Sequence, residues 1–478
     1  MSPTSTSPLP PEETLGFVRS KWQDDVLPTL SRYIEIPAKS PAFDADWAAH
    51  GHIDGAVALI EDWGRRRPIE GLTVETFRLP GRTPVMLLDV PGTAPETVLL
   101  YGHCDKQPEM VGWDSGLGPW TAVRRGDRLY GRGAQDDGYA VFCALTAIEA
   151  VQRAGAPHAR CLVLIEASEE SGSPDLPAYM ESLAKRIGEP DLVICLDSGC
   201  GNYEQLWGTT SLRGIVNGLL TVEVLTEGVH SGAASGIVPS SFRIARQLLS
   251  RIEDERTGAI AEDFHVQIPA ARAAEAREVA KLLGTDIAGR FPLVPGMRYA
   301  QDEAVELLLA GTWKPALSVI GAAGLPAPAD GGNVLRPLTS LKLSLRIPPT
   351  LDATRAGRRL TEILESDPPY GAKVSFKSSS PSPGWDAPTT KPWLLEAVHA
   401  ASRRHFGRPA MFNGLGGSIP FMAMLGERFP RAQFFITGTG GPGSNAHGPN
   451  EFLHVPFAER LTACVADLIA EHYRTGRS

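Results

Sequence analysis

Short apolar runs alternate with stretches of helical periodicity over the first two fifths of the chain. The runs Thr97–Tyr101, Cys161–Ile165 and Asp191–Leu196 predict buried strands. Between the first two, Tyr139–Gln152 carries apolar residues at helical spacing. This alternation favours βαβ units, so we expect an α/β fold whose mixed, largely parallel sheet carries helices on both faces.

The pattern of apolar and polar positions changes after residue 212. Apolar residues at every second position in Leu220–Val224 predict a half-exposed strand, and the same alternation returns in Leu341–Ile347. The stretches Ser240–Ile252 and Asp352–Glu365 have helical periodicity instead. Alternating strands with intervening helices indicate a separate, smaller α+β module.

A chain of 478 residues is too long for one ordinary hydrophobic core. We expect a flexible tail over residues 1–11, a discontinuous catalytic domain formed by 12–212 and 389–478, and an inserted domain over 213–388. The Ser/Pro-rich stretch Ser378–Pro388 is a plausible hinge at the end of the insertion. After it, a strand-like run at Gln433–Ile436 leads into the glycine-rich segment before His447.

Composition narrows the classes of function. Hydrophobic residues make up 42% of the chain and charged residues 21%, which is ordinary for a soluble enzyme. A net charge of -9 without a basic cluster argues against a nucleic-acid partner. No apolar run is long enough to cross a bilayer, so we expect no membrane partner. The 6 cysteines lack the spacing of a disulfide framework, which favours reduced thiols and a cytoplasmic location.

Acidic residues and histidines follow or adjoin several of the apolar, strand-like runs. They are His103, Asp105, Asp136, Asp137, Glu169, Glu170, Asp197 and His447. Open α/β sheets place their ligands beyond the carboxyl ends of the strands, so these side chains are expected to converge. Imidazoles and carboxylates are ligands for a pair of divalent metal ions, which can activate water for hydrolysis. The sequence therefore predicts a two-metal hydrolase.

Other interpretations of single motifs remain. Glu169 and Glu170 could form a solvated turn, and Asp197 could cap a strand. The glycine-dense stretch Gly438–Gly443 has no GxxxxGK[ST] pattern, which argues against a phosphate cradle. The chain also lacks a GxSxG motif, which argues against a serine hydrolase of the α/β type.

Motifs spread over nearly the whole chain resemble one family, the dinuclear-zinc M20 metallopeptidases and in particular their carnosinase-like dipeptidase branch. The motifs that carry the resemblance are Tyr101–Asp105 (YGHCD), Gly112–Asp114 (GWD), Leu129–Asp137 (LYGRGAQDD), Glu166–Ser173, Gly228–Gly232 (GVHSG), Gly416–Pro420 (GGSIP) and Ala446–Glu451 (AHGPNE). Their order and spacing make coincidence improbable. The resemblance implies a zinc-exopeptidase-like fold whose inserted domain serves as a lid and a dimerisation domain.

The resemblance also implies a metal-ligand set. His103 and Asp197 would bind one metal, Glu170 and His447 the other, and Asp136 would bridge the two. Zinc is the expected metal, with manganese or cobalt as alternatives. The family holds the peptide bond after Asp136 in the cis form.

Further roles follow from the same resemblance. Glu169 would be the general base, and Asp105 would accept the second ring N–H of His103 and so fix its tautomer. His230, in the inserted domain, would reach the active site of a partner subunit in a homodimer and stabilise the oxyanion there.

The expected substrate pocket contains Arg346, Asn333, Gly417 and Ser418. Arg346 lies on the polar side of its alternating strand and would clamp a substrate carboxylate in the bidentate geometry that favours arginine. A cross-strand salt bridge is the alternative role for Arg346.

Three functions remain open at this stage. The first is hydrolysis of the amide bond of a dipeptide or a similar small substrate with a free carboxylate. The second is removal of the acyl group from an N-acyl amino acid, as in a deacylase or desuccinylase. Gly414 and Leu415 stand where the family usually has arginine and glutamate, and this loss of charge bears on the choice between the two. The third is a non-catalytic homologue, which typically lacks a ligand or the base.

Overall fold

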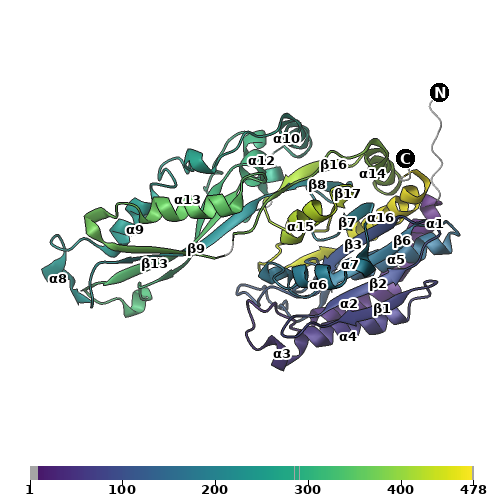
Figure 1. Ribbon diagram of the computed structural model, residues 1–478, viewed down its shortest axis with the longest axis horizontal. Coiled ribbons are helices and arrows are strands. Elements are labelled where there is room, and N and C mark those ends of the chain that lie inside the picture. The colour runs from purple at the N-terminus through teal and green to yellow at the C-terminus, as the bar shows by residue number, and fades with distance from the viewer. Residues whose placement is uncertain (1–8, 285, 290, 380, 476–478) are drawn as a thin grey trace.

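The chain folds into two lobes that lie end to end in the computed structural model (Figure 1). The structure describes residues 9–284, 286–289, 291–379 and 381–475. The large lobe contains the described residues at both ends of the chain, and the small lobe is formed from the middle of the chain.

The large lobe is built on a 9-stranded sheet. Its strands in spatial order are β1 (Thr73–Phe77), β2 (Val85–Val90), β6 (Arg160–Glu166), β3 (Thr97–His103), β7 (Leu192–Cys195), β17 (Gln433–Ile436), β8 (Trp207–Leu212) and β15 (Trp385–Asp386), with β16 (Met411–Leu415) beside β8. The pairs β6–β3, β3–β7, β7–β17 and β8–β16 are parallel.

The sheet is parallel at its centre and antiparallel toward its edges, apart from the parallel pair β8–β16. β1 pairs antiparallel with β2, β2 with β6, β17 with β8, and β8 with β15. The prediction of a mixed α/β sheet is confirmed, and its largely parallel character holds for the centre. The antiparallel pair β1–β2 is joined by a short connection, which parallel strands cannot use.

Helices cover both faces of this sheet, as its apolar strands require. Along β3, Val98 and Leu100 face one hydrophobic core, and Leu99 and Tyr101 face the other. The first core is completed mainly by α1 (Pro11–Lys21), α2 (Leu27–Ile34), α4 (His52–Arg65), α5 (Ala140–Arg153), α14 (Pro392–Phe406) and α16 (Val455–Thr475). The second is completed by α6 (Leu176–Ser182), α7 (Ala184–Ile187) and α15 (Pro420–Arg428).

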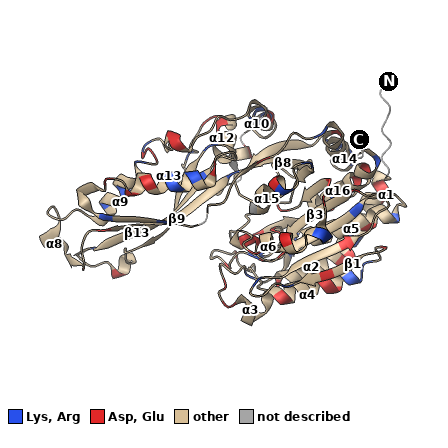
Figure 2. Ribbon diagram, in the orientation of Figure 1, with Lys and Arg blue, Asp and Glu red and all other residues tan. Residues whose placement is uncertain are grey.

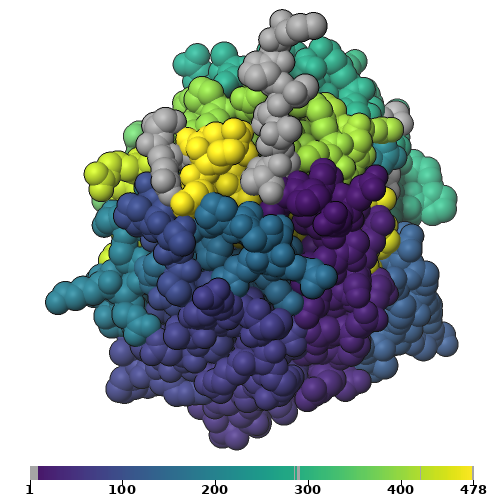
Figure 3. Space-filling view, turned by 90° about the vertical axis from the view of Figure 1, so that its right-hand side faces the viewer, coloured from purple at the N-terminus to yellow at the C-terminus, as the bar shows by residue number. Residues whose placement is uncertain are grey.

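The two ends of the chain meet on one side of the large lobe. In Figure 3 the N-terminal helical region and the C-terminal helix, purple and yellow, lie close together. The indole Nε1 of Trp22 donates to Thr462 Oγ1 at 3.1 Å, which links the end of α1 to α16. Residues 1–8 of the predicted tail lie outside the described residues. Leu9 is buried and α1 begins at Pro11, so the described end of that tail is packed.

The small lobe contains an antiparallel 4-stranded sheet in the order β11 (Ala316–Ala323), β13 (Leu338–Ile347), β9 (Gly214–Glu223) and β14 (Lys373–Ser378). Its buried face packs on α9 (Ser241–Leu249) and α13 (Ala353–Glu365) (Figure 1). The short pair β10 (Val229–His230) and β12 (Val334–Leu335) lies beside α8 (Ser231–Ala234) at the outer tip. The predicted α+β module is therefore present.

The middle of the insertion does not pack entirely with the small lobe. Ala276 and Val279 of α10 (Ala270–Leu283), and Leu308 and Leu309 of α12 (Ala304–Thr312), belong to the first core of the large lobe. The domain limits at 212 and 389 therefore remain a proposal, since part of 213–388 completes the large lobe.

Charged residues of both signs are distributed over the described part of the chain. Lys and Arg lie among Asp and Glu on both lobes (Figure 2). Of the helices that the structure describes, none combines the length and hydropathy needed to span a membrane.

Candidate metal centre

The candidate ligands lie beyond the carboxyl ends of the central strands. His103 ends β3, Glu169 and Glu170 follow β6, and Asp197 follows β7. Because β3, β6 and β7 are parallel, these residues meet at one edge of the sheet. Loops from the same edge supply Asp136, before α5, and His447, after β17.

His103 lies at the centre of this cluster and is buried. Its Nε2 is 3.4 Å from Asp136 Oδ1, 3.9 Å from Glu169 Oε2 and 3.9 Å from Asp197 Oδ1. This nitrogen is buried and has no hydrogen-bond partner among the described residues. A buried imidazole nitrogen that faces three carboxylates without a hydrogen bond fits a metal ligand.

His447 approaches the same carboxylate from the other side. Its Nε2 is 3.0 Å from Asp136 Oδ2 and 3.3 Å from Glu170 Oε2. Each oxygen of Asp136 is thus close to a different imidazole. Groups formed by His103, Asp136 and Glu170, and by His103, Asp137 and Asp197, have the spacing of metal ligands. The donor set of nitrogen and carboxylate oxygen suits divalent cations such as zinc.

Asp105 connects two parts of the centre. Its Oδ1 lies 3.5 Å from His103 Nδ1, and the carbonyl oxygen of Asp105 lies 3.1 Å from the same nitrogen. The Asp105 carboxylate also accepts hydrogen bonds from the backbone N–H groups of Glu169 at 3.1 Å and Glu170 at 3.0 Å. Asp105 therefore holds both the imidazole and the Glu169–Glu170 turn. The resemblance implied only the first of these contacts.

Burial of so many acids shifts their proton affinities. Burial raises the pKa of Glu169, and raises that of Glu170 to about 8 and that of Asp197 to about 6. Burial would lower the pKa of His447, but the Glu170 and Asp136 carboxylates raise it to about 9. Without added positive charge, Glu169, Glu170 and Asp197 hold their protons more tightly, because burial disfavours their charged forms and neighbouring carboxylates repel them. Divalent cations would supply the missing charge.

Asp137 is a buried acid to which the family resemblance assigns no role of its own. Its Oδ2 accepts the backbone N–H of His103 at 3.3 Å, and its Oδ1 has no hydrogen-bond partner among the described residues. The Asp136–Asp137 peptide bond is cis, as the resemblance implied.

A buried ion pair that the sequence analysis did not anticipate links two of the loops. Arg132 Nη1 is 2.6 Å from Glu451 Oε2, and both side chains are buried. Arg132 Nη2 donates to the carbonyls of His447 at 3.1 Å and Gly448 at 2.8 Å. Glu451 Oε1 accepts the backbone N–H of Gly133 at 3.0 Å. The pair therefore fixes the loop that carries His447 against the loop that carries Asp136.

Removing one partner of this pair is expected to destabilise the protein strongly. Glu451→Ala leaves the Arg132 guanidinium buried without its carboxylate, which costs about 3–5 kcal/mol in the free energy of unfolding. Urea unfolding of the metal-free protein measures the loss. Glu181→Ala, at an exposed glutamate of α6, is the control and should change stability by less than about 0.5 kcal/mol. A loss below about 1 kcal/mol for Glu451→Ala would contradict the assigned role.

His230 and Asn333 lie together at the outer tip of the small lobe. β10 pairs His230 with Val334, and the carbonyl of Asn333 accepts the backbone N–H of Ser231 at 2.9 Å. The neighbouring helix α8 is at the opposite end of the molecule from β3 (Figure 1). Neither residue reaches the metal centre of its own chain, and Asn333 does not join Arg346.

Arg346 and Ser418 do lie together, near the junction of the lobes. Arg346 Nη1 donates to Ser418 Oγ at 3.4 Å, and Gly417 precedes Ser418 in the same loop. Within the described residues Arg346 makes no ion pair, so the alternative role in a cross-strand salt bridge is not observed.

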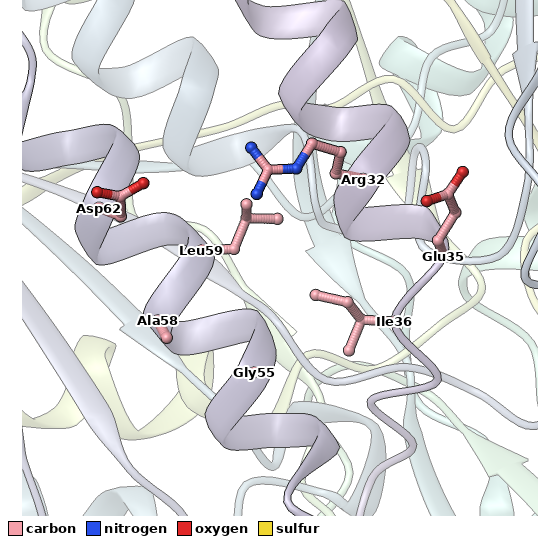
Figure 4. Close-up of a pocket in the computed structure, with 7 residues that line it drawn as sticks. All are labelled: Arg32, Glu35, Ile36, Gly55, Ala58, Leu59 and Asp62. Carbon is pink, nitrogen blue, oxygen red and sulfur yellow. The ribbon is translucent and has the colours of Figure 1, made fainter.

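Two surface grooves lie apart from these groups. One, of about 460 Å³, runs between α2 and α4 and is lined by Arg32, Glu35, Ile36, Gly55, Ala58, Leu59 and Asp62 (Figure 4). The other, of about 470 Å³, lies along α13. Neither groove is lined by a candidate site residue.

The chain is similar over most of its length to known dipeptidases. The chain is 27% identical over 381 residues to the cysteinylglycine-S-conjugate dipeptidase of Corynebacterium striatum, which covers 77% of this chain and 80% of the relative. The solved structure of the dipeptidase Dug1p from Saccharomyces cerevisiae matches with a TM-score of 0.80 at 20% identity, over 98% of this chain and 99% of that one. Human carnosine dipeptidase 1 matches with a TM-score of 0.79 at 21% identity, over 98% and 100%.

A family model settles the classification. The model for peptidase family M20/M25/M40 matches residues 99–471. This range contains every candidate ligand from His103 to His447. The resemblance predicted from the motifs is confirmed, as is the prediction of a metal-dependent hydrolase. The chain belongs to peptidase family M20/M25/M40.

Proposed function

We propose that this hydrolase uses two divalent metal ions to cleave the amide bond of a dipeptide or a similar small substrate with a free carboxylate. The observation that carries the proposal is the arrangement at Asp136, whose two oxygens lie 3.4 Å from His103 Nε2 and 3.0 Å from His447 Nε2. Glu169 lies beside them, with its Oε2 3.9 Å from His103 Nε2. A shared carboxylate between two imidazoles, next to a buried acid, suits two-metal hydrolysis.

The ligands divide into two sets around Asp136. His103 and Asp197 would hold one metal, Glu170 and His447 would hold the other, and Asp136 would contribute to both. Zinc is the proposed metal because its ligands are typically imidazole and carboxylate, and manganese and cobalt are the alternatives. When bound, the cations would polarise the amide carbonyl and lower the pKa of a water molecule.

The side chains around the centre perform the proton transfers and hold the geometry. Glu169 takes the proton of the attacking water and delivers it to the departing amine, a task helped by the burial that raises the pKa of this carboxyl. Asp105 keeps the His103 ring and the Glu169 backbone in place through its contacts to both. Arg346 and Ser418 bind the substrate carboxylate, and Gly417 lets the substrate approach their loop.

The names of relatives favour a dipeptide substrate. The Corynebacterium striatum relative is a dipeptidase by name, and it covers most of this chain. An N-acyl amino acid is the alternative substrate, because its hydrolysis needs the same centre and differs only in the pocket. A non-catalytic homologue is disfavoured because His103, Asp136, Glu170 and His447 converge as a ligand set requires.

Chelation and substrate panels test this function. Chelator is expected to abolish turnover, and zinc, manganese or cobalt to restore it, because the centre supplies several kcal/mol of barrier lowering. A panel of dipeptides and N-acyl amino acids then separates the two substrate classes, with the release of free amine as the measured signal. Turnover that is indifferent to chelator contradicts the metal proposal, and exclusive turnover of N-acyl amino acids contradicts the dipeptide proposal.

The small lobe offers a surface for the proposed homodimer. β11 is an edge strand of the small sheet, with Val319 and Ile320 about half exposed, at 49% and 54%. An exposed apolar edge strand tends to pair with another chain. Pairing through the small lobe would bring the distant His230 of one subunit toward the centre of the other. The free thiols of all 6 cysteines are compatible with the proposed cytoplasmic location.

A mixture of inactive subunits tests whether His230 acts across the dimer. A His230→Ala subunit paired with a Glu169→Ala subunit contains one site with both residues intact. Random mixing is therefore expected to restore about one quarter of wild-type activity, because half of the dimers are mixed and half of their sites are complete. Separate preparations of each variant are the controls. Failure to regain activity in a mixture shown to exchange subunits contradicts the shared site.

A further inference from the structure

Two arginines, Arg346 and Arg213, lie next to the junction of the lobes. Arg346 on β13 is directly opposite Ile215 on β9. Arg213 lies two residues before Ile215, and the charge of Arg346 contributes to lowering the pKa of Arg213. Arg213 is also the single residue between β8 of the large sheet and β9 of the small one.

Both guanidinium groups reach the same loop. Arg213 Nε donates to the carbonyl of Gly416 at 3.2 Å, and Arg346 Nη1 donates to Ser418 Oγ at 3.4 Å. The loop sequence from Gly414 to Ser418 is Gly-Leu-Gly-Gly-Ser, which contains no acid. This loop is also where the proposed function places the substrate carboxylate.

No carboxylate balances the two charges among the residues that the structure describes. The other contacts of Arg213 are to the carbonyls of Ala310 and Lys314, both at 3.2 Å, near the C-terminal end of α12. Carbonyls satisfy N–H groups but carry only partial charge. Burial lowers the pKa of Arg213 to about 10, and the Arg346 cation contributes to this shift. Arg213 therefore stays charged at neutral pH and senses the charge of Arg346, whose own pKa is lowered by burial.

Resting on the proposed function, we propose that this cationic pair selects dipeptides whose C-terminal residue is aspartate or glutamate. Arg346 binds the main-chain carboxylate, and Arg213 attracts the carboxylate of the C-terminal side chain. A substrate with one carboxylate leaves one positive charge unbalanced in a partly buried site, whereas a substrate with two balances both. The pair thus sets the substrate class of the centre.

The N–H groups that remain free on each arginine are consistent with these two binding roles. A guanidinium has five N–H groups, and Arg346 uses one nitrogen in a single long contact. It can therefore bind a carboxylate with two parallel hydrogen bonds. Arg213 uses Nε and Nη1 for backbone carbonyls, and its Nη2 has no hydrogen-bond partner within the described part of the chain.

Pairs of substrates that differ in one charge test the inference without any variant. Ala-Glu and Ala-Gln have nearly the same shape, as do Ala-Asp and Ala-Asn. The acidic member of each pair is expected to have a kcat/KM about tenfold higher, which corresponds to about 1.4 kcal/mol, and to gain it mainly through KM. The ratio should fall as salt is raised, because a charge interaction in a partly exposed site is screened.

Three variants then assign the effect to Arg213. Arg213→Gln should reduce the Ala-Glu to Ala-Gln ratio to about one, whereas Arg213→Lys should keep most of it because the charge remains. Lys342→Gln is the matched control, since Lys342 is an exposed cation on the same face of β13, four positions from Arg346, and should leave the ratio unchanged. Because each result is a ratio within one protein, partial misfolding of a variant does not alter it.

The outcomes separate this inference from the function it rests on. Equal rates for Ala-Glu and Ala-Gln in an enzyme that hydrolyses dipeptides overturn the inference and leave the proposed function standing. An unchanged ratio in Arg213→Gln overturns the role of Arg213. If no dipeptide is hydrolysed by the metal-loaded protein, the proposed function fails and the inference fails with it.

Discussion

Replacing Glu169 by glutamine is expected to lower kcat by about 10²–10⁴-fold and to leave the metal content unchanged. Glutamine preserves the size of the side chain and its carbonyl oxygen, but it cannot accept and return a proton. The position of this carboxylate, 3.9 Å from His103 Nε2 and held by the Asp105 contact to its own N–H, places it at the centre without making it a proposed ligand.

Steady-state kinetics together with elemental analysis of the same preparation checks this prediction. Glu181→Gln, at an exposed glutamate of α6, is the matched control and should behave as wild type. KM should change little, because the lost interaction belongs to the transition state. A variant that loses metal along with activity would instead assign Glu169 to the ligand set, and a rate within about tenfold of wild type would remove it from the proton transfer.

The convergence of His103, Glu169 and Asp197 could be predicted from the sequence because each ends or follows a recognisable strand. The buried runs that end near His103, Glu169 and Asp197 become the parallel strands β3, β6 and β7, and parallel strands share one carboxyl edge. Convergence of their loops therefore needs no knowledge of long-range contacts. The approach of His447, more than 300 residues later in the chain, was implied by the family resemblance.

Contacts between loops that are distant in the chain could not be predicted from the local sequence. Arg132 and Glu451 are 319 residues apart, and nothing in their local sequence shows that they form a buried ion pair. The family resemblance implied that Asn333 and Arg346 share one substrate pocket. The pairing of β10 with β12 instead carries Asn333 to the tip beside His230. Register between strands that are about a hundred residues apart is set by tertiary packing.

The pattern of apolar residues also could not predict where one lobe ends and the other begins. An apolar stripe on α10 shows that the helix is buried on one side but does not show which core it joins. Its Ala276 and Val279 pack in the large lobe, together with Leu308 and Leu309 of α12. The carbonyls of Ala310 in α12 and of Lys314, just after this helix, accept hydrogen bonds from Arg213 at the junction. This packing therefore contributes to the substrate end of the site.

Replacing Asp136 by asparagine is expected to have the broadest effect on the centre. Its Oδ1 lies 3.4 Å from His103 Nε2, and its Oδ2 lies 3.0 Å from His447 Nε2. Asparagine has no negative charge and only one side-chain oxygen, so the substitution weakens the site of both proposed metals. Metal content should fall from about two ions per chain to fewer than one, and kcat/KM by at least about 10³-fold, because the loaded centre lowers the barrier by several kcal/mol.

The comparison with His447→Ala decides whether Asp136 is shared. That variant removes a ligand from one proposed metal only, so it should retain about one ion per chain. Asp127→Asn, at an exposed aspartate in the turn between β4 (Val123–Arg125) and β5 (Arg128–Tyr130), is the control for the general effect of an added amide. Two ions retained in Asp136→Asn would contradict the bridging assignment. If both variants lost the same amount of metal, the two metals would bind only together, because the loss of either side chain would then empty the centre.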